Sequence, residues 1–360
     1  MIEALTHIGQ MYPDSASYIT AMYYFEGRAI SGAAYFRLLR PVVPFCASLL
    51  NHFVGIEASF SVLNFILWCS SSLLMFKLAE LLTDRTDAAF ISSAIFTASI
   101  PMLLYGGAIL TDMADYFFVL LGTFLVLRLD LPRASYPKVV ATSLIIALGV
   151  LSKEFVASVI ITAMVWTLLT KGSWRRVALV AFIVFAVTFV WSTVIGVSYV
   201  SWFSYAVDVV SKVAPFESQN VPVMLRAWIW IRTIRLAFRP EILLAGIIGF
   251  VVILKHKIKL PDFVASLSGP TIITAALALA GAGTDYRYTF IMFPGLLPLA
   301  ALGILCVTRE VATMFAGRGG RSEKLATLLS LLIVLAFIVE TNLITLRYLS
   351  LPWHPYIAPQ

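Results

Sequence analysis

Charged side chains are scarce in this sequence. Only 12% of its 360 residues are Asp, Glu, Lys or Arg, whereas 60% are hydrophobic. Soluble domains carry about 25% charged residues, so an ordinary soluble domain is excluded. The three cysteines, Cys46, Cys69 and Cys306, lie far apart in apolar surroundings, which predicts buried thiols and no disulfide framework. The four histidines are scattered, and neither an HExxH nor a paired-cysteine metal motif occurs.

Long apolar runs separated by short polar turns fill the chain after residue 58. They cover about 59–82, 88–105, 114–129, 139–151, 155–169, 177–200, 242–254, 264–282, 288–307 and 325–346. A helix that crosses a bilayer needs about 20 such residues, and several runs are shorter than this. We expect an all-α polytopic membrane protein with about ten transmembrane helices.

The positions of Lys and Arg predict how these helices are oriented. Basic residues cluster in alternate short loops, near residues 85, 128–138, 171–176, 255–259 and 309–324. The positive-inside rule places these loops in the cytoplasm. The segments 1–57, 106–113, 153–154, 201–239, 283–287 and the tail after 347 are then external. The net charge of +7 is explained by these topology signals, so no nucleic-acid partner is expected.

Four parts follow from this topology. Residues 1–57 form an external first loop with interfacial helices, one over 15–27 and one that begins after Pro41. Residues 58–200 form an N-terminal transmembrane catalytic module, 201–239 an external basic-aromatic loop, and 240–360 the C-terminal transmembrane helices. Because the N-terminus is external with no helix before it, we expect that a first transmembrane helix is missing from the chain. The first ten residues do not resemble a signal peptide.

Two acidic residues on the expected external face are candidates for chemistry. Asp14 precedes the first interfacial helix, and Asp112 lies between two apolar runs with Asp115 one turn later. Each could simply cap a helix. Both, however, share a face with basic residues that the positive-inside rule should deplete: Arg37, Arg40, Lys153, Arg226, Arg232, Arg235, Arg239 and Arg287. Asp14 and Asp112 could also hold a divalent metal ion, because carboxylate oxygens suit hard cations.

Four of those arginines lie in one stretch, RAWIWIRTIRLAFR, over residues 226–239. This stretch could be an interfacial anchor whose arginines extend toward water. It could equally form a groove for a lipid phosphate, which the guanidinium group binds well.

Four motifs in order resemble one enzyme family. They are PDSASY…RLLRPVVPFCASLLNHFVG, IPMLLYGGAILTDMADYFFVLLGTFLVLR, LGVLSKEFVA and DYRYTFIMFPGLLPLAALGI, which together run from about residue 12 to residue 303. The pattern resembles the membrane-integral C-type glycosyltransferases, and within them the protein O-mannosyltransferase and lipid A aminoarabinose transferase-like family. The chain departs from that family at Ser15, Ser152 and Tyr286, where Glu, Thr and Glu are usual.

The resemblance implies an inverting glycosyltransferase. It would move a sugar from a polyprenyl-phosphate donor to a hydroxyl, amine or phosphate of a lipid, glycan or protein acceptor at the outer membrane face. Asp14 would be the general base, and Asp112 would position the base, the acceptor or a metal ion. The donor phosphate would be bound by Lys153 and Arg287, to which the basic stretch adds Arg232 and Arg235. Substrate-positioning residues would be Tyr18, Arg40, Asp115, Glu154 and Asp285.

Two other functions stay open at this level. A transporter or flippase of a lipid-linked or anionic solute would carry ionisable residues in the middle of its spans. The candidates here, Lys77, Glu80 and Glu340, lie nearer the ends of their runs. A non-catalytic subunit of a glycan-assembly complex is the third interpretation, and the expected missing helix favours it.

Overall fold

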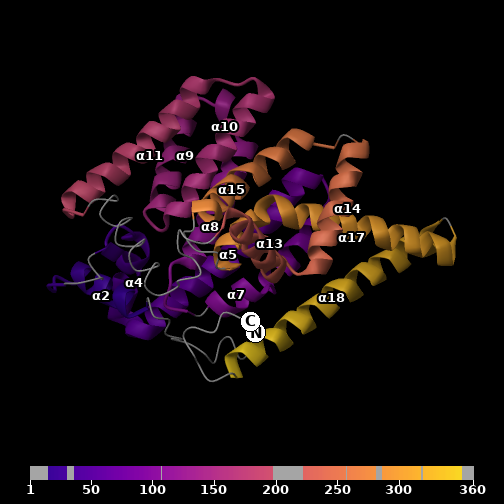
Figure 1. The fold of residues 1–360 in the computed structure, drawn as a ribbon, viewed down its shortest axis with the longest axis horizontal. Coiled ribbons are helices and arrows are strands. Elements are labelled where there is room, and N and C mark those ends of the chain that lie inside the picture. The colour runs from indigo at the N-terminus through magenta and orange to yellow at the C-terminus, as the bar shows by residue number, and fades with distance from the viewer. Residues whose placement is uncertain are drawn as a thin grey trace.

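The structure is a computed structural model that describes residues 15–30, 36–106, 108–197, 222–256, 258–280, 286–317 and 319–350. Within these ranges it contains helices and no strand, which confirms the all-α prediction (Figure 1). The helices are α2 (Ser15–Phe25), α4 (Val42–Val54), α5 (Ile56–Thr83), α6 (Thr86–Thr97), α7 (Ile100–Tyr105), α8 (Asp112–Arg128), α9 (Tyr136–Val150), α10 (Ser158–Thr170), α11 (Trp174–Val194), α13 (Val223–Phe238), α14 (Pro240–His256), α15 (Leu260–Ala280), α16 (Tyr286–Thr289), α17 (Phe293–Ala316) and α18 (Gly320–Ser350). Three 3-10 turns complete them: η1 (Leu131–Arg133), η2 (Glu154–Ala157) and η4 (Phe290–Met292).

Each predicted apolar run is mainly helical over its described residues, but the number of spans is not confirmed. Five helices are long and apolar enough to cross a membrane: Ala58–Thr83, Trp174–Val194, Leu260–Leu279, Arg287–Ala316 and Gly320–Arg347. A sixth is added if α13 and α14, which meet at 94°, count as one bent span. The helices over 42–54, 136–150 and 154–170 are apolar but shorter. The described residues therefore support an integral membrane protein and leave the expected count of about ten untested.

The run over 88–105 is broken rather than continuous. Helix α6 ends at Thr97, and α7 begins at Ile100 with Pro101 in its first turn. Proline is disfavoured in a helix interior but fits a first turn, so Pro101 favours the start of a new helix here. The segment after α7 then leads to Asp112, the first residue of α8.

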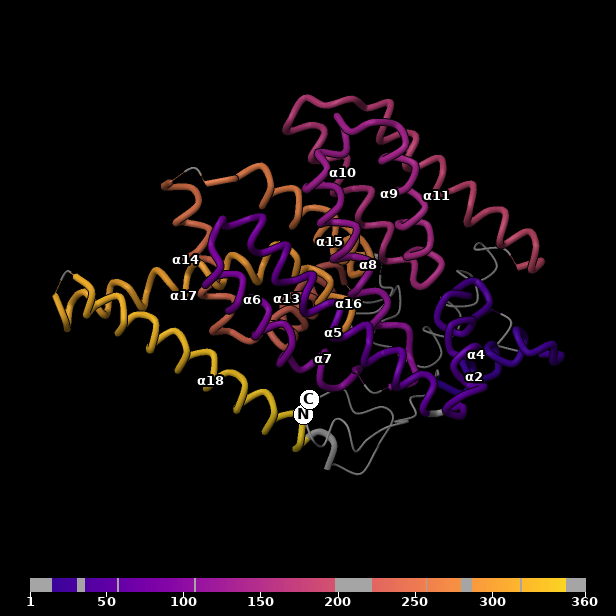
Figure 2. The backbone as a smooth tube through the Cα atoms, turned by 180° about the vertical axis from the view of Figure 1, so that it is seen from behind, coloured from indigo at the N-terminus to yellow at the C-terminus, as the bar shows by residue number. Residues whose placement is uncertain are grey.

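Close helix contacts are made at glycines. A Cβ atom on Gly303 of α17 would lie 1.9 Å from the Ala245 carbonyl oxygen of α14, and one on Gly249 would lie 1.9 Å from the Leu299 carbonyl oxygen. Helices α14 and α17 lie side by side in both backbone views (Figures 1 and 2). Small residues let the backbones of membrane helices approach in this way.

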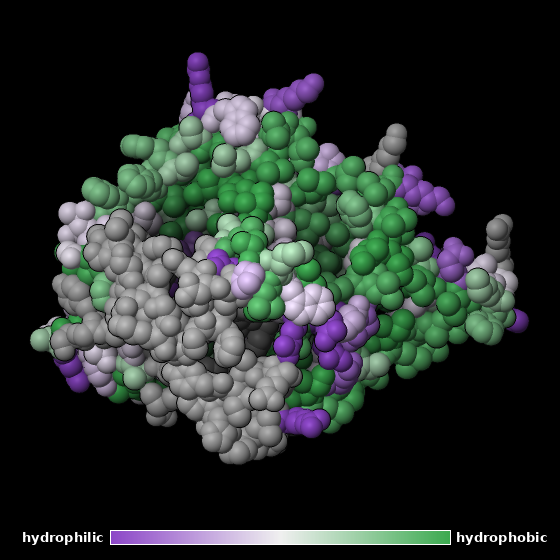
Figure 3. Space-filling model, in the orientation of Figure 1, coloured by the Kyte–Doolittle hydropathy of each residue, from purple (hydrophilic) through white to green (hydrophobic). Residues whose placement is uncertain are grey.

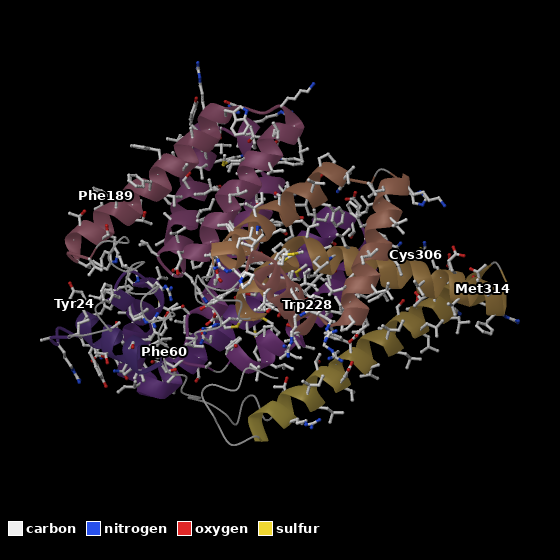
Figure 4. The ribbon with its side chains drawn as sticks, viewed as in Figure 1. Tyr24, Phe60, Phe189, Trp228, Cys306 and Met314 are labelled. Atoms are coloured by element: carbon white, nitrogen blue, oxygen red, sulfur yellow. The ribbon has the colours of Figure 1, made fainter. Side chains whose placement is uncertain are left out.

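Much of the described surface on the face shown in Figure 3 is apolar. Helix α11 exposes Phe182, Phe185 and Phe189, and Phe189 points outward in Figure 4. Contiguous apolar surface of this kind suits contact with lipid. All three cysteines are free, as expected, but Cys69 is exposed and the other two are half-buried. The expectation of buried thiols is wrong because apolar positions in this chain also face outward.

Loops predicted to share the cytoplasmic face contact one another. Lys259 Nζ lies 2.6 Å from Asp84 Oδ1 and bonds the Leu81 carbonyl. Arg176 donates to the Pro132 carbonyl at 2.7 Å, and Trp166 Nε1 to Asp130 Oδ1 at 3.1 Å. These contacts agree with the predicted alternation of loops.

Candidate active site

Helix α2 packs with its apolar side against the protein. Tyr18 and Met22, four residues apart on α2, are both buried in a cluster with Phe60 of α5, which Figure 4 labels. At its start, Ser15 Oγ donates to the Ile109 carbonyl at 3.0 Å, and Tyr18 Oη lies 3.2 Å from Thr111 Oγ1. The first interfacial helix is therefore attached to the turn that immediately precedes Asp112.

An ion pair joins three distant segments of the chain. Asp112 is the first residue of α8 and is 2% exposed, and its carboxylate contacts the ammonium group of Lys153, which is 3% exposed. Lys153 has extended backbone between α9 and η2. On the other side of the carboxylate, Arg287 of α16 lies 3.9 Å from Asp112 Oδ2. The structure thus brings together residues that the sequence predicted for three different external loops.

Lys153 is held as a cation. Burial by itself would lower the pKa of this lysine, but the charge of Asp112, followed by that of Asp115, outweighs burial and raises the pKa. Its Nζ also lies 5.0 Å from the centre of the Tyr288 ring, while the Arg287 guanidinium lies 4.8 Å from the same ring. Two cations therefore converge on one aromatic ring, which attracts each of them.

A second, partly buried ion pair lies next to the first. Arg40 Nε and NH2 bond the two carboxylate oxygens of Glu154 at 2.8 and 2.5 Å, and NH1 donates to Tyr18 Oη at 2.7 Å. Such two-point contacts fix orientation as well as charge. Through Arg40, the segment after α2 is fixed to the residue that follows Lys153.

Asp115 lies one turn into α8 and is fully buried. Among the described residues, neither of its carboxyl oxygens has a hydrogen-bond partner. A buried carboxylate without partners is costly, so such groups are rare outside functional sites. Beside Lys153 and Asp112, Asp115 is an acceptor that a bound hydroxyl could use.

The other predicted site residues are placed as follows. Asp14 and Asp285 lie outside the described residues. Arg232 and Arg235 are exposed on α13, as is Trp228 (Figure 4). The opposite face of α13 packs on α16 and η4, with the Phe238 and Phe290 rings stacked at 5.2 Å. Within the described ranges, no group of three or more His, Cys, Asp or Glu side chains could hold a metal ion.

Sequence reasoning overlooked two residues of the site, Thr111 and Tyr288. Thr111 bonds Tyr18, and the Tyr288 ring lies against both cations. Both adjoin residues that were singled out, but neither type carries a charge. Only their contacts across the fold reveal them.

Comparison with solved structures finds the same arrangement of helices. ArnT from Cupriavidus metallidurans bound to undecaprenyl phosphate matches 96% of this chain and 71% of its own, with a TM-score of 0.60 at 15% identity. The apo form of that protein matches with a TM-score of 0.57 at 14% identity, over 94% of this chain and 74% of its own. AglB, an oligosaccharyltransferase from Archaeoglobus fulgidus in complex with an inhibitory peptide and a dolichol-phosphate, matches 94% of this chain and 52% of its own. Its TM-score is 0.56 at 14% identity.

No protein-family model and no curated protein matches the sequence. On the structural comparison alone, this chain has the fold of ArnT and of the oligosaccharyltransferase AglB.

Proposed function

We propose that the protein is an inverting glycosyltransferase that uses a polyprenyl-phosphate sugar as donor. The observation that carries the proposal is the convergence of Lys153 and Arg287 on the Asp112 carboxylate and on the Tyr288 ring. Of the three cations in the site, Arg287 is the most accessible, with 19% of its side chain exposed against 11% for Arg40 and 3% for Lys153. It is the cation best placed to meet an anionic ligand.

The charges of the site suit a phosphate leaving group. The site contains three cations, Arg40, Lys153 and Arg287. Two carboxylates, those of Asp112 and Glu154, form ion pairs with them. As the bond between the anomeric carbon and the phosphate oxygen breaks, negative charge grows on the phosphate. Preorganised positive charge in a buried site stabilises that transition state.

The acceptor needs a base to take its proton. We assign this role to Asp14, which precedes the helix that is docked on the Asp112 turn. Attack by the acceptor from the side opposite the phosphate gives inversion, and general base catalysis contributes about 10²–10⁴-fold. Asp112 is engaged by Lys153 and Arg287, so it orients these cations rather than accepting the proton. Asp115, Glu154, Tyr18 and Arg40 position the substrates, and Asp285 joins them from the segment before α16.

The neighbours support a lipid-linked donor. ArnT was solved with undecaprenyl phosphate and AglB with a dolichol-phosphate. The exposed arginines of α13, Arg232 and Arg235, would meet the phosphate region of such a lipid at the membrane surface. We place this site on the external or periplasmic face, where the loops with Asp112, Lys153 and Arg287 are predicted to lie.

The test is release of polyprenyl phosphate by the purified protein in lipid. A panel of polyprenyl-phosphate sugars is supplied with candidate acceptors, and wild type is compared with Asp14→Asn, Arg287→Gln and Arg309→Gln. The last is a matched control, because Arg309 is exposed elsewhere on α17. We expect release from wild type and the control, none from Asp14→Asn, and a dissociation constant for polyprenyl phosphate raised about tenfold or more in Arg287→Gln.

The same assay separates the alternative functions. A flippase would move labelled lipid between the leaflets of a vesicle without releasing polyprenyl phosphate. A non-catalytic subunit would do neither, and Asp14→Asn would then behave as wild type in cells.

A further inference from the structure

We propose that Asn64 is a positioning residue that holds the turn carrying Asp112. The observation is a set of hydrogen bonds from α5 to the 108–111 turn. Asn64 Nδ2 donates to the carbonyl oxygens of Ala108, at 2.5 Å, and Leu110, at 3.4 Å. More than 40 residues separate Asn64 from this turn in the sequence, and the asparagine is fully buried.

The surroundings of Asn64 make these bonds functional rather than incidental. Asn64 belongs to a helix long and apolar enough to cross the membrane. A polar side chain at such a position is costly unless it is used. Irregular backbone near membrane depth must likewise have its carbonyl groups satisfied by the protein. The hydrogen bonds of Asn64 satisfy its own amide N–H groups and the carbonyl groups of the turn together.

The orientation of the amide follows from chemistry. Both neighbouring groups are carbonyl oxygens, which can only accept hydrogen bonds, so the NH2 end must face them. The opposite atom, Oδ1, is buried without a partner. The position of Asn64 therefore satisfies the N–H donors of its amide and leaves the acceptor oxygen Oδ1 without a hydrogen bond among the described residues.

The turn is held from two sides. Asn64 holds the carbonyls of Ala108 and Leu110, and Ser15 of α2 holds the carbonyl of Ile109 between them. The next residue, Thr111, accepts the first-turn N–H bond of Asp115 on its carbonyl. Three successive carbonyls are thus fixed just before Asp112, and Asn64 fixes two of them. We infer that it sets the position at which Asp112 meets Lys153 and Arg287.

The experiment compares Asn64→Leu, Asn64→Asp and Ser71→Ala in the full-length protein. Ser71 is the matched control, because it is also buried on α5 but its hydroxyl has no hydrogen-bond partner. Amide hydrogen exchange is followed in peptides over 106–116 and, as a reference, in α17. The rate of polyprenyl phosphate release is measured with its KM; this second readout rests on the proposed function.

We expect Asn64→Leu to speed exchange over 108–112 about tenfold, with α17 and the Ser71→Ala protein unchanged. The turnover number should fall while KM for the donor changes less than about twofold, because the phosphate cations remain. Asn64→Asp keeps the shape but has a donor only when protonated. Its turn should therefore regain protection, and its turnover number should rise relative to wild type, as pH falls.

Wild-type exchange over 108–112 in a folded Asn64→Leu protein would overturn the inference. So would equal loosening by Ser71→Ala. If Asn64→Leu fails to fold, the test is the pH dependence of amide exchange over 108–112 in Asn64→Asp. Exchange that does not change with pH in this variant would contradict the inference. If wild type releases no polyprenyl phosphate, the proposed function fails, and the exchange data still decide whether Asn64 holds the turn.

Discussion

The ammonium group of Lys153 contacts the carboxylate of Asp112 across 41 residues of sequence. The two side chains are only 3% and 2% exposed. Removing one member of a buried pair leaves a charge without compensation, whereas removing both can be almost neutral. Comparing the single and double variants therefore distinguishes a role of the ion pair in stability from a role in sugar transfer.

Lys153→Met should lower the free energy of unfolding by about 3–5 kcal/mol, because Asp112 stays buried with only the more distant Arg287 beside it. Chemical denaturation in detergent micelles measures the change. The double variant Asp112→Asn with Lys153→Met should recover most of the stability and none of the transfer activity. A single variant as stable as wild type would contradict the buried ion pair.

Asp115→Asn should leave the fold intact. Neither carboxyl oxygen makes a hydrogen bond with the described residues, so the isosteric amide removes no such bond. If Asp115 accepts a substrate hydroxyl, KM should rise about 2- to 10-fold, since one net hydrogen bond contributes about 0.5–1.5 kcal/mol. Steady-state release of polyprenyl phosphate over a range of donor and acceptor concentrations tests this. Asp262→Asn, in α15, is the control, and an unchanged KM in Asp115→Asn would rule out the positioning role.

Arg40 and Glu154 should be energetically coupled. A double-mutant cycle with Arg40→Met and Glu154→Gln is expected to give a coupling energy of about 1–3 kcal/mol, because the contact is two-point and largely buried. The exposed pair of Lys77 and Glu80 gives the comparison, with at most about 0.5 kcal/mol. Unfolding measurements on the two sets of variants provide the values. Equal coupling in both cycles would show that the Arg40 contact does not fix α2 to the site.

Gly303→Ala should destabilise the protein by about 1–3 kcal/mol or more. The added Cβ would lie 1.9 Å from a backbone oxygen of α14, which can move only if the helix moves. At Gly320 the same substitution meets no atom within 4 Å, so Gly320→Ala should be close to neutral. Thermal unfolding of the two alanine variants makes the comparison. A neutral Gly303→Ala would mean that α14 and α17 are further apart than described.

The helices and the residues of the site were largely predictable from local pattern. Apolar runs with short polar turns predict membrane helices because lipid demands both properties, and each of these runs is mainly helical over its described residues. Arg40, Asp112, Lys153 and Arg287 are predicted site residues because the positive-inside rule and the cost of charge near a membrane disfavour them on the expected external face. The break between α6 and α7 was missed, although Ser99 and Pro101 signalled it. Asn64 was missed too, and a lone amide inside an apolar run was its only signal.

The sequence by itself determined the class of protein, the helical segments and the set of ionisable side chains at the ends of helices. These properties depend on hydropathy and on neighbours within a few residues. Which ionisable groups meet follows from the tertiary structure: Lys153 pairs with Asp112 and Arg40 with Glu154, whereas the Asp115 carboxyl makes no hydrogen bond with the described residues. Such pairings depend on the approach of segments distant in sequence, here α8 and the residues that follow α9, which are 41 positions apart in the Lys153–Asp112 pair. Composition and residue spacing do not predict which distant segments come into contact.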